Sequence, residues 1–426
     1  MKLLLLVVCC MISSSLAGLI DKEAKLETVF NEIEEVLQDL KADDNDEPHP
    51  EPIGDIQKFE SMFNDRELQN GAVIEGDISP KPSHKQDSQG KSAMEEMLLH
   101  TENIDEATAE VEAAGGRVLL QLGHNLLVVK VPSHVAKQNS FSQASAHISS
   151  SASAETFRHA HAYWTAREDE LKPQPPVQKW TERMAPMAFK QEDSDEGSQI
   201  GTPYRQTMTG KIGVIILIAS GPGSLAINNA EYNTISSECL RGLKFWSDHA
   251  SVEGVTLSFV MYDTRATISA ENPTSCPSRE SCHNVFVDPT LQAFHYPTGK
   301  AGMDQLAQNV KSYYNADGAF LAFFSKYRQS HYAYSRSGGP IYMQYSNDGW
   351  GPDQIDRVFA HEAGHVFNAP DEYGACQCTE LYGKGSCTAK NFNCKDCTSS
   401  PTSCIMDSNM ALDSLCENTK KHVGWC

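Results

Sequence analysis

The feature that most constrains the fold is an uninterrupted apolar run. Residues 212–218 read Ile-Gly-Val-Ile-Ile-Leu-Ile, without a polar side chain. A run without alternation is typical of a strand buried on both faces, as in a parallel sheet covered by helices. Strands separated by helices after about residue 205 therefore predict an α/β fold with a mixed, mostly parallel sheet. The elements expected around the run are helices at 230–249 and 303–314 and strands at 257–262, 318–325 and 339–345.

The amino terminus has the pattern of an export signal. Lys2 precedes an apolar stretch, and the small residues Ser15 and Ala17 complete a signal peptide at 1–17. The stretch is too short to span a bilayer, and no later stretch approaches the roughly 20 apolar residues that a spanning helix needs. We therefore expect a secreted, extracellular protein without a membrane span.

The chain of 426 residues is longer than one compact core usually requires, so several units are expected. Residues 18–92 are acidic and polar and are expected to form a partly disordered propeptide. Residues 93–133 predict a small α+β unit, with a helix at 104–114 and strands at 118–120 and 126–131. This pattern is similar to the small inhibitory propeptide domains of some secreted proteases, which implies that the propeptide inhibits the mature chain.

Residues 134–204 are rich in Ser, Ala, Gln and Pro and are expected to form a linker that a processing protease can reach. We expect His159 and His161 to be exposed there rather than to hold a metal. The formal net charge is −21, and the acidic excess lies mostly before residue 200. No basic face is offered to phosphate, so a nucleic-acid partner is not expected.

The chain has 13 cysteines, and all except Cys9 and Cys10 lie at or after Cys239. In an exported chain such cysteines indicate disulfides, and they crowd into a lobe after about residue 374 that is too small to be held by its core. Cys276 and Cys282 are expected to pair locally. The odd number leaves one thiol, for which Cys239 is the candidate, either free and buried or paired between molecules. A zinc-ribbon interpretation is the weaker alternative for the spacing of Cys376, Cys378, Cys387, Cys394, Cys397 and Cys404.

The sequence His361-Glu362-Ala363-Gly364-His365 lies in a predicted helix that begins near Gly351-Pro352-Asp353 and ends at about residue 367. Residues four apart share a helix face, so both imidazoles can bind one ion while Glu362 lies beside them. Neutral nitrogen ligands, an acidified water and a nearby carboxylate are the parts that zinc hydrolysis needs. Glu362 is the expected general base, and it would later pass the proton to the leaving amine. A helix that merely carries two histidines is the alternative.

From His361 to Asp371 the sequence resembles the long zinc motif of the metzincin metalloproteases. That family has glycine where this chain has Asn368, and it usually has histidine, sometimes aspartate, where this chain has Asp371. Asparagine tolerates the positive φ that the turn requires. A carboxylate oxygen is an acceptable ligand for Zn²⁺. The resemblance thus implies one catalytic Zn²⁺ bound by His361, His365 and Asp371.

Metzincins also carry a methionine in a turn beneath the zinc, and Met406 in Cys404-Ile405-Met406-Asp407 is the candidate. In astacin-type members a glutamate after the third ligand helps to anchor the new amino terminus, and Glu372 matches it. Those members have a tyrosine two residues after the methionine, where this chain has Ser408. Tyr373 is expected either to hydrogen-bond the developing oxyanion or to serve only in packing.

Ile74-Glu75-Gly76-Asp77-Ile78 resembles the short propeptide segment of astacins in which an aspartate takes the place of the zinc-bound water. This resemblance makes Asp77 a possible latch, and a plain turn is the alternative.

These features predict a secreted zinc-dependent endopeptidase that is made as a zymogen and acts on proteins or peptides. We expect the catalytic domain at 205–426, with a metzincin-like fold, an active-site helix and a Cys-rich carboxy-terminal lobe. An extracellular structural or metal-binding protein that keeps the fold without turnover is the first alternative. A zinc hydrolase outside the metzincins, with an aspartate ligand and no methionine turn, is the second.

Overall fold

The computed structural model describes residues 94–136 and 207–426, together with a few residues between 156 and 166. All of them belong to one compact unit, Ile56–Cys426. The expected signal peptide, the acidic stretch 18–92 and Asp77 lie outside the described residues. The described residues between 156 and 166 are 156, 159, 160, 162, 163 and 166, and those left out after 207 are 336, 337, 348, 349, 375, 385, 408, 409 and 411.

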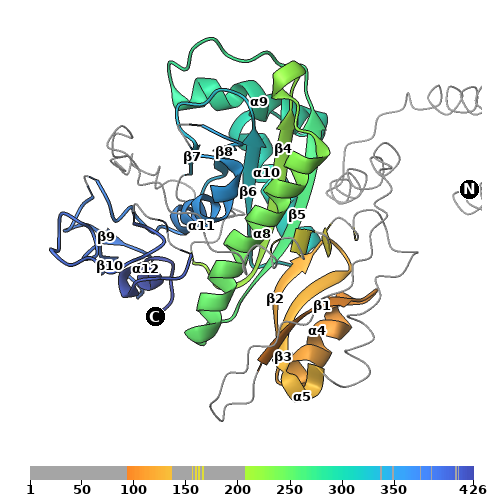
Figure 1. Cartoon of the computed structure of the whole chain (residues 1–426), viewed down its shortest axis with the longest axis vertical. Coiled ribbons are helices and arrows are strands. Elements are labelled where there is room, and N and C mark those ends of the chain that lie inside the picture. The colour runs from red at the N-terminus through yellow and green to blue at the C-terminus, as the bar shows by residue number, and fades with distance from the viewer. Residues whose placement is uncertain are drawn as a thin grey trace, which may run out of the picture. The chain divides into compact units, whose positions relative to one another are not determined.

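An eight-stranded sheet with the strand order β1-β3-β2-β5-β4-β6-β8-β7 forms the centre of the fold (Figure 1). The adjacent strands β2, β5, β4, β6 and β8 run parallel to one another. At the two ends of the sheet, β1 pairs antiparallel with β3, β3 with β2, and β7 with β8. The predicted α/β class with a mixed, mostly parallel sheet is therefore confirmed. The strands are β1 (Met94–His100), β2 (Arg117–Leu122), β3 (Leu126–Pro132), β4 (Gly210–Ser220), β5 (Leu257–Thr267), β6 (Gly318–Ser325), β7 (Ala333–Tyr334) and β8 (Ile341–Gln344).

Strand β4 is the apolar run of the sequence, and it is buried from Ile212 onward. Its alternate side chains pack against two different helix layers, because successive residues of a strand point to opposite faces. Ile212, Val214 and Ile216 share a core with α8 (Asn229–Val252) and α11 (Ile355–Val366). The intervening Ile215 and Leu217 share a core with α9 (Arg279–Ala293) and α10 (Gly299–Tyr313).

The small unit predicted at 93–133 contains α4 (Ile104–Ala113) between β1 and β2, and α5 (Ser133–Ala136) follows β3. The helix and two strands expected there are found, whereas β1 was not expected. Strand β2 pairs in parallel with β5, with Leu120 opposite Phe259, so the unit continues the central sheet. The unit contacts the rest of the sheet through the β2–β5 pair, and β7 is the strand at the other edge of the sheet.

The expectation that His159 is exposed is wrong. Its side chain is 2% exposed, and Nε2 lies 3.1 Å from Oδ1 of Asp263, which is fully buried on β5. Tyr163 is also buried, and its hydroxyl donates to Glu96 of β1 at 3.1 Å. Burying an aspartate is costly unless it is paired, and His159 supplies that partner. His161 lies outside the described residues.

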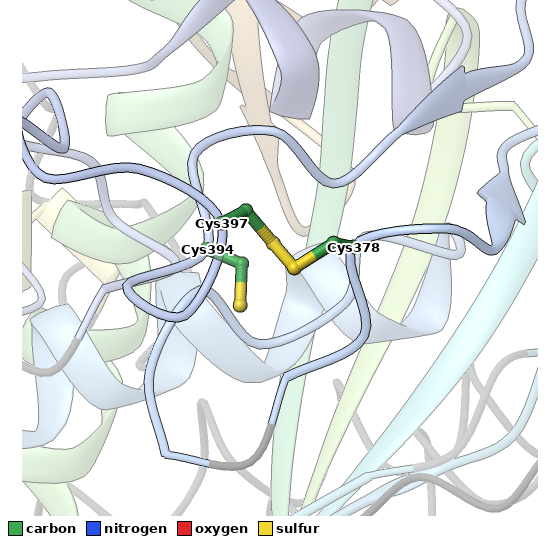
Figure 2. A group of neighbouring side chains, drawn as sticks. All are labelled: Cys378, Cys394 and Cys397. Carbon is green, nitrogen blue, oxygen red and sulfur yellow. A yellow bond between two sulfur atoms is a disulfide. The ribbon is translucent and has the colours of Figure 1, made fainter.

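Disulfides hold the carboxy-terminal lobe, as expected from its cysteine content. The pairs are Cys376–Cys394, Cys378–Cys397 and Cys387–Cys426. Figure 2 shows the Cys378–Cys397 bond with Cys394 beside it. The lobe contains little regular structure apart from two short strands and one short helix, which are β9 (Leu381–Tyr382), β10 (Ala389–Lys390) and α12 (Glu417–His422).

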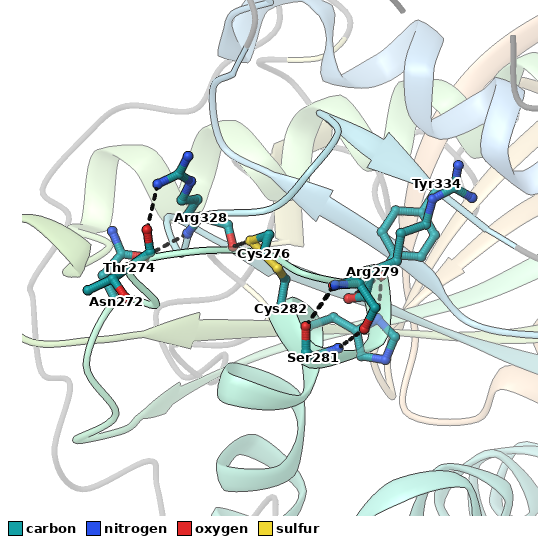
Figure 3. The surroundings of a disulfide bond; sticks show 10 residues. Asn272, Thr274, Cys276, Arg279, Ser281, Cys282, Arg328 and Tyr334 are labelled. Atoms are coloured by element: carbon teal, nitrogen blue, oxygen red, sulfur yellow. Dashed lines mark hydrogen bonds between the residues drawn. A yellow bond between two sulfur atoms is a disulfide. The ribbon is translucent and has the colours of Figure 1, made fainter. Parts of the chain in front are cut away.

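The expected local pair Cys276–Cys282 is also a disulfide, and it joins the loop before α9 to the first turn of that helix (Figure 3). Cys239 of α8 is buried and free, which is one of the two states expected for it. Among the described residues, no helix has both the length and the apolar character needed to cross a membrane.

Candidate metal centre

Helix α11 carries both histidines of the motif, and all of its residues are buried. It follows the short 3-10 turn η3 (Pro352–Gln354), which begins at the predicted Gly351-Pro352-Asp353 start. Helix α8 fixes α11 from one side, since Arg241 forms a 2.7 Å ion pair with Asp356 and the indole of Trp246 donates to Ala360 O at 2.9 Å. The motif therefore lies on a rigid element, which precise ligand positions require.

The chain turns sharply after α11 at Asn368, which has a φ of 73°. The N–H of Asn368 donates to His365 O, and that of Ala369 donates to Gly364 O, both at 3.0 Å. This pair of bonds is the Schellman ending of a helix, which needs a left-handed residue at that position. The expected turn is confirmed, and it brings Asp371 back beside the two histidines.

Three donor atoms converge at this point. Nε2 of His361 lies 3.1 Å from both Nε2 of His365 and Oδ1 of Asp371, and the latter two atoms are 3.2 Å apart. Tetrahedral zinc with bonds of about 2.0–2.1 Å separates its ligand atoms by about 3.3 Å. The spacing and the donor types therefore fit Zn²⁺, and all three residues are buried.

The other ring nitrogen of each histidine is already engaged. Nδ1 of His361 donates to Ile405 O at 2.9 Å, and Nδ1 of His365 donates to Ala369 O at 2.7 Å. In the neutral form of each ring, these bonds set the tautomer that presents the Nε2 lone pair to a metal.

The electrostatics of the site favour a positive charge. Desolvation lowers the pKa of His365, but Asp371 and Glu362 outweigh it and raise that pKa to about 9. Desolvation opposes ionisation of Asp371 in turn, yet the two histidines hold its pKa below the ordinary value. A buried carboxylate that stays ionised provides a charged oxygen for a cation.

Glu362 is buried beside the ligands, and Ser335 holds its carboxylate. The Ser335 hydroxyl lies 2.9 Å from Oε2 of Glu362 and 2.8 Å from its backbone oxygen. Ser335 follows β7 and was not singled out in the sequence, because a lone serine in a loop carries no spacing signal. Trp246 and Arg241 were missed for a related reason, since their function depends on contacts between distant segments.

Met406 is fully buried and packs against α11. A Cβ placed on Gly364 would lie 2.6 Å from its sulfur and 3.3 Å from Trp246, so any larger residue between the two histidines would have to displace Met406. The backbone around Met406 also contacts the site, because Ile405 O accepts from His361 and Met406 O accepts the Glu372 N–H at 2.9 Å.

Tyr373 and Glu372 differ in their surroundings. The Tyr373 ring lies 5.9 Å from the His361 ring, and its hydroxyl bonds to Asp371. Burial and the neighbouring carboxylates raise the pKa of Tyr373 well above its ordinary value, so the phenol remains a donor.

Glu372 is buried in the carboxy-terminal lobe, where Asn393 donates to it at 2.6 Å and Thr419 at 2.9 Å. Burial raises its pKa to about 8. Ser408 lies outside the described residues.

The cysteine cluster that suggested a zinc ribbon is built differently. Cys378, Cys394 and Cys397 lie close together (Figure 2), but each sulfur is in a disulfide, so these atoms have no thiolate to offer a metal. The weaker zinc-ribbon alternative is thereby excluded for these residues.

No protein-family model and no curated protein sequence matches this chain.

Proposed function

We propose that the chain is a secreted zinc endopeptidase of the metzincin type, made as a zymogen. The observation that supports this most directly is the convergence of His361, His365 and Asp371 beside Glu362. A zinc ion held by those three side chains would acidify a water and polarise the carbonyl of a peptide bond. Met406 beneath Gly364 is consistent with the methionine turn of that family.

Glu362 is the proposed general base. It accepts the proton of the attacking water and returns it to the leaving amine. Ser335 orients the carboxylate through its 2.9 Å hydrogen bond to Oε2. Tyr373 keeps its phenol proton next to the ligands, and stabilising the oxyanion would require that proton to turn from Asp371 to the substrate.

The edge strand β7 and its neighbour β8 provide a way to hold substrate. The loop between them bonds to the end of α11 through Gly338 N and Val366 O at 2.9 Å. An extended protein or peptide substrate can add to such an edge by backbone hydrogen bonds.

The propeptide remains the proposed inhibitor. Residues 94–136 join the sheet beside β5, whereas the sheet edge next to α11 is β7. These residues are therefore not at the edge beside the candidate metal centre, and we assign the inhibitory segment to residues 18–92. Asp77 is the candidate there. Asp77→Ala should give a precursor that cleaves substrate before processing, and a precursor that stays silent would remove this residue from the proposal.

The decisive experiment compares the processed chain with its Glu362→Gln variant on an unfolded protein substrate, with and without a chelator. We expect the parent to cleave and the chelator to stop it. We also expect the variant to retain zinc and lose at least about a hundredfold in kcat/KM. Cleavage that survives the substitution would refute the mechanism. A parent that binds zinc without cleaving any of a set of unfolded substrates would favour the extracellular binding protein instead.

A further inference from the structure

We infer that Cys404 and Cys416 form a fifth disulfide, which covalently closes the turn that carries Met406. The inference concerns covalent structure and does not depend on whether the chain cleaves peptides. Of the described cysteines, eight are paired in four disulfides, and Cys239, Cys404 and Cys416 are free thiols. Cys239 lies on α8, whereas the other two thiols lie together in the carboxy-terminal lobe.

The two sulfurs share the same buried surroundings. Sγ of Cys404 and Sγ of Cys416 lie within 4.8 Å of each other. The Cys416 N–H donates to Sγ of Cys404 at 3.4 Å, and Oγ1 of Thr419 lies 3.3 Å from one sulfur and 3.5 Å from the other. The two sulfurs are therefore neighbours, and a disulfide requires them to approach from within 4.8 Å to about 2.05 Å.

The proposed pair would leave one free thiol among the eleven described cysteines, the number that an odd count requires in an exported chain. With Cys404 and Cys416 joined, every cysteine of the lobe is oxidised and Cys239 is left as the single odd thiol. Because the other six cysteines of this lobe form three disulfides, we expect the two adjacent buried thiols to be oxidised as well in an exported chain.

The bond would act on the metal centre through the backbone. Cys404 directly precedes Ile405 and Met406, whose carbonyls accept from His361 Nδ1 and from the Glu372 N–H. Cys416 caps α12 and donates to Glu372 at 2.9 Å. A disulfide here would anchor to α12 the segment that orients the first zinc ligand.

Closure proceeds by thiol–disulfide exchange with a small disulfide or a protein oxidase. The Cys416 thiolate attacks one sulfur of that disulfide and displaces a thiol. The Cys404 thiolate then attacks the mixed disulfide, forms the Cys404–Cys416 bond and displaces the second thiol. Two protons and two electrons leave the chain with the two released thiols. Both sulfurs are buried in the folded chain, so the exchange belongs to folding, before the lobe closes.

Peptide mapping of the secreted full chain tests the inference. The chain is unfolded in N-ethylmaleimide without reductant and then digested. We expect a linked Cys404–Cys416 peptide pair, lighter than the two thiol peptides by the mass of two hydrogens, and a maleimide adduct on Cys239 alone. Adducts on Cys404 and Cys416 would overturn the inference, and a second equivalent of zinc in the same sample would identify the Glu372, Cys404 and Cys416 cluster as a metal site.

Two variants sharpen the map. Cys416→Ser should release Cys404, so that maleimide labels both Cys404 and Cys239. Cys239→Ser is the matched control, and it should remove the remaining adduct and leave the linked pair intact. A Cys404 that stays unlabelled in Cys416→Ser would show that it pairs elsewhere and would refute the assignment. Loss of all cleavage activity with the linked pair present would count against the proposed function and leave this inference standing.

Discussion

Each histidine of the candidate metal centre uses one ring nitrogen for a backbone carbonyl and points the other toward the remaining candidate ligands. The carbonyls belong to Ala369 and Ile405, which lie in the turn after α11 and in the turn that carries Met406. Ligand geometry is therefore set by two backbone turns as much as by the helix. Side chains that fix either turn should therefore affect metal binding at the candidate centre without being ligands themselves.

Asn368 is such a residue, because its φ of 73° lies in the left-handed region. We expect Asn368→Ala to destabilise the chain by about 1–2 kcal/mol, the cost of that conformation for a residue with a Cβ. Asn368→Gly, the control, should stay within about 0.5 kcal/mol of the parent, since glycine adopts the turn freely. Urea unfolding measures both values. Equal stability of the alanine variant and the parent would mean that the turn relaxes.

Ser335 should affect catalysis rather than stability. Ser335→Ala removes the hydroxyl that bonds to Oε2 of Glu362, and we expect kcat/KM to fall about tenfold, the worth of one hydrogen bond to a charged group. Zinc content, measured by atomic absorption, should not change. A variant with full activity would show that Glu362 is held without Ser335.

At the level of elements, α8 and α11 approach each other closely at Gly242. A Cβ there would lie 2.7 Å from Asp356 O and 3.0 Å from the Phe359 ring. Both lie on α11, which carries the two histidines of the candidate metal centre, so the separation of the two helices sets the position of those histidines. Because the Asp356 oxygen belongs to the backbone, it cannot rotate away from a Cβ at position 242, so the two helices would have to move apart.

Gly242→Ala should therefore cost about 1–3 kcal/mol in unfolding free energy, the usual range for overpacking a core. It should also weaken zinc retention against a chelator. Ser251→Ala, on the same helix but half-buried near its end, is the control and should change neither quantity. A Gly242→Ala chain as stable as the parent would show that the contact is looser than the distances imply.

The length and hydrophobic pattern of each element decide whether it could be predicted from the sequence. Long periodic or fully apolar segments such as β4, α8 and β6 were expected close to their observed limits. Strand β1 was missed because it contains the adjacent charged residues Glu95 and Glu96, which break an apolar strand pattern. Helix α9 was missed because its sequence contains Pro289, which argues against a helix, and because its apolar residues do not follow one stripe. Strand β7 has only two residues, too few for a periodic signal.

The candidate site was more predictable than its supports. His361, Glu362, His365 and Asp371 have fixed spacing within one short segment, so local geometry brings them together. The contacts of Ser335 and Trp246 with α11, and the pairing of His159 with Asp263, join segments far apart in the chain. Such pairings depend on the completed fold, which the spacing of residues along the sequence does not encode.

On the scale of the whole molecule, the carboxy terminus closes the chain on the start of β4. Met208 N donates to Val423 O at 2.8 Å, and the Trp425 indole donates to Met208 O at 2.6 Å. Cys426 is held by its disulfide to Cys387. His422 lies in the middle of this closure, fully buried, with Nε2 3.2 Å from Ala389 O.

His422 should make global stability depend on pH. Burial lowers the pKa of His422 to about 4, so the folded chain keeps it neutral while the unfolded chain protonates it below about pH 6.5. Above pH 6.5 His422 is neutral in both states and costs nothing. Between pH 6.5 and 4 the unfolded chain gains a proton that the folded chain does not, so the free energy of unfolding falls by about 3 kcal/mol in total. His422→Gln should flatten this part of the curve in urea unfolding at pH 7, 5.5 and 4. An unchanged slope would assign the effect to other groups.

The parallel pairing of β2 with β5 has a consequence for a processed chain. A cut anywhere between residues 137 and 206 would break the backbone but would leave every hydrogen bond of that pairing in place. A strand edge left bare is a template for unwanted pairing, so keeping the front piece protects β5 from aggregation. The mature molecule would then be a nicked heterodimer, which elutes as one species on a sizing column and separates into two bands only when it is unfolded.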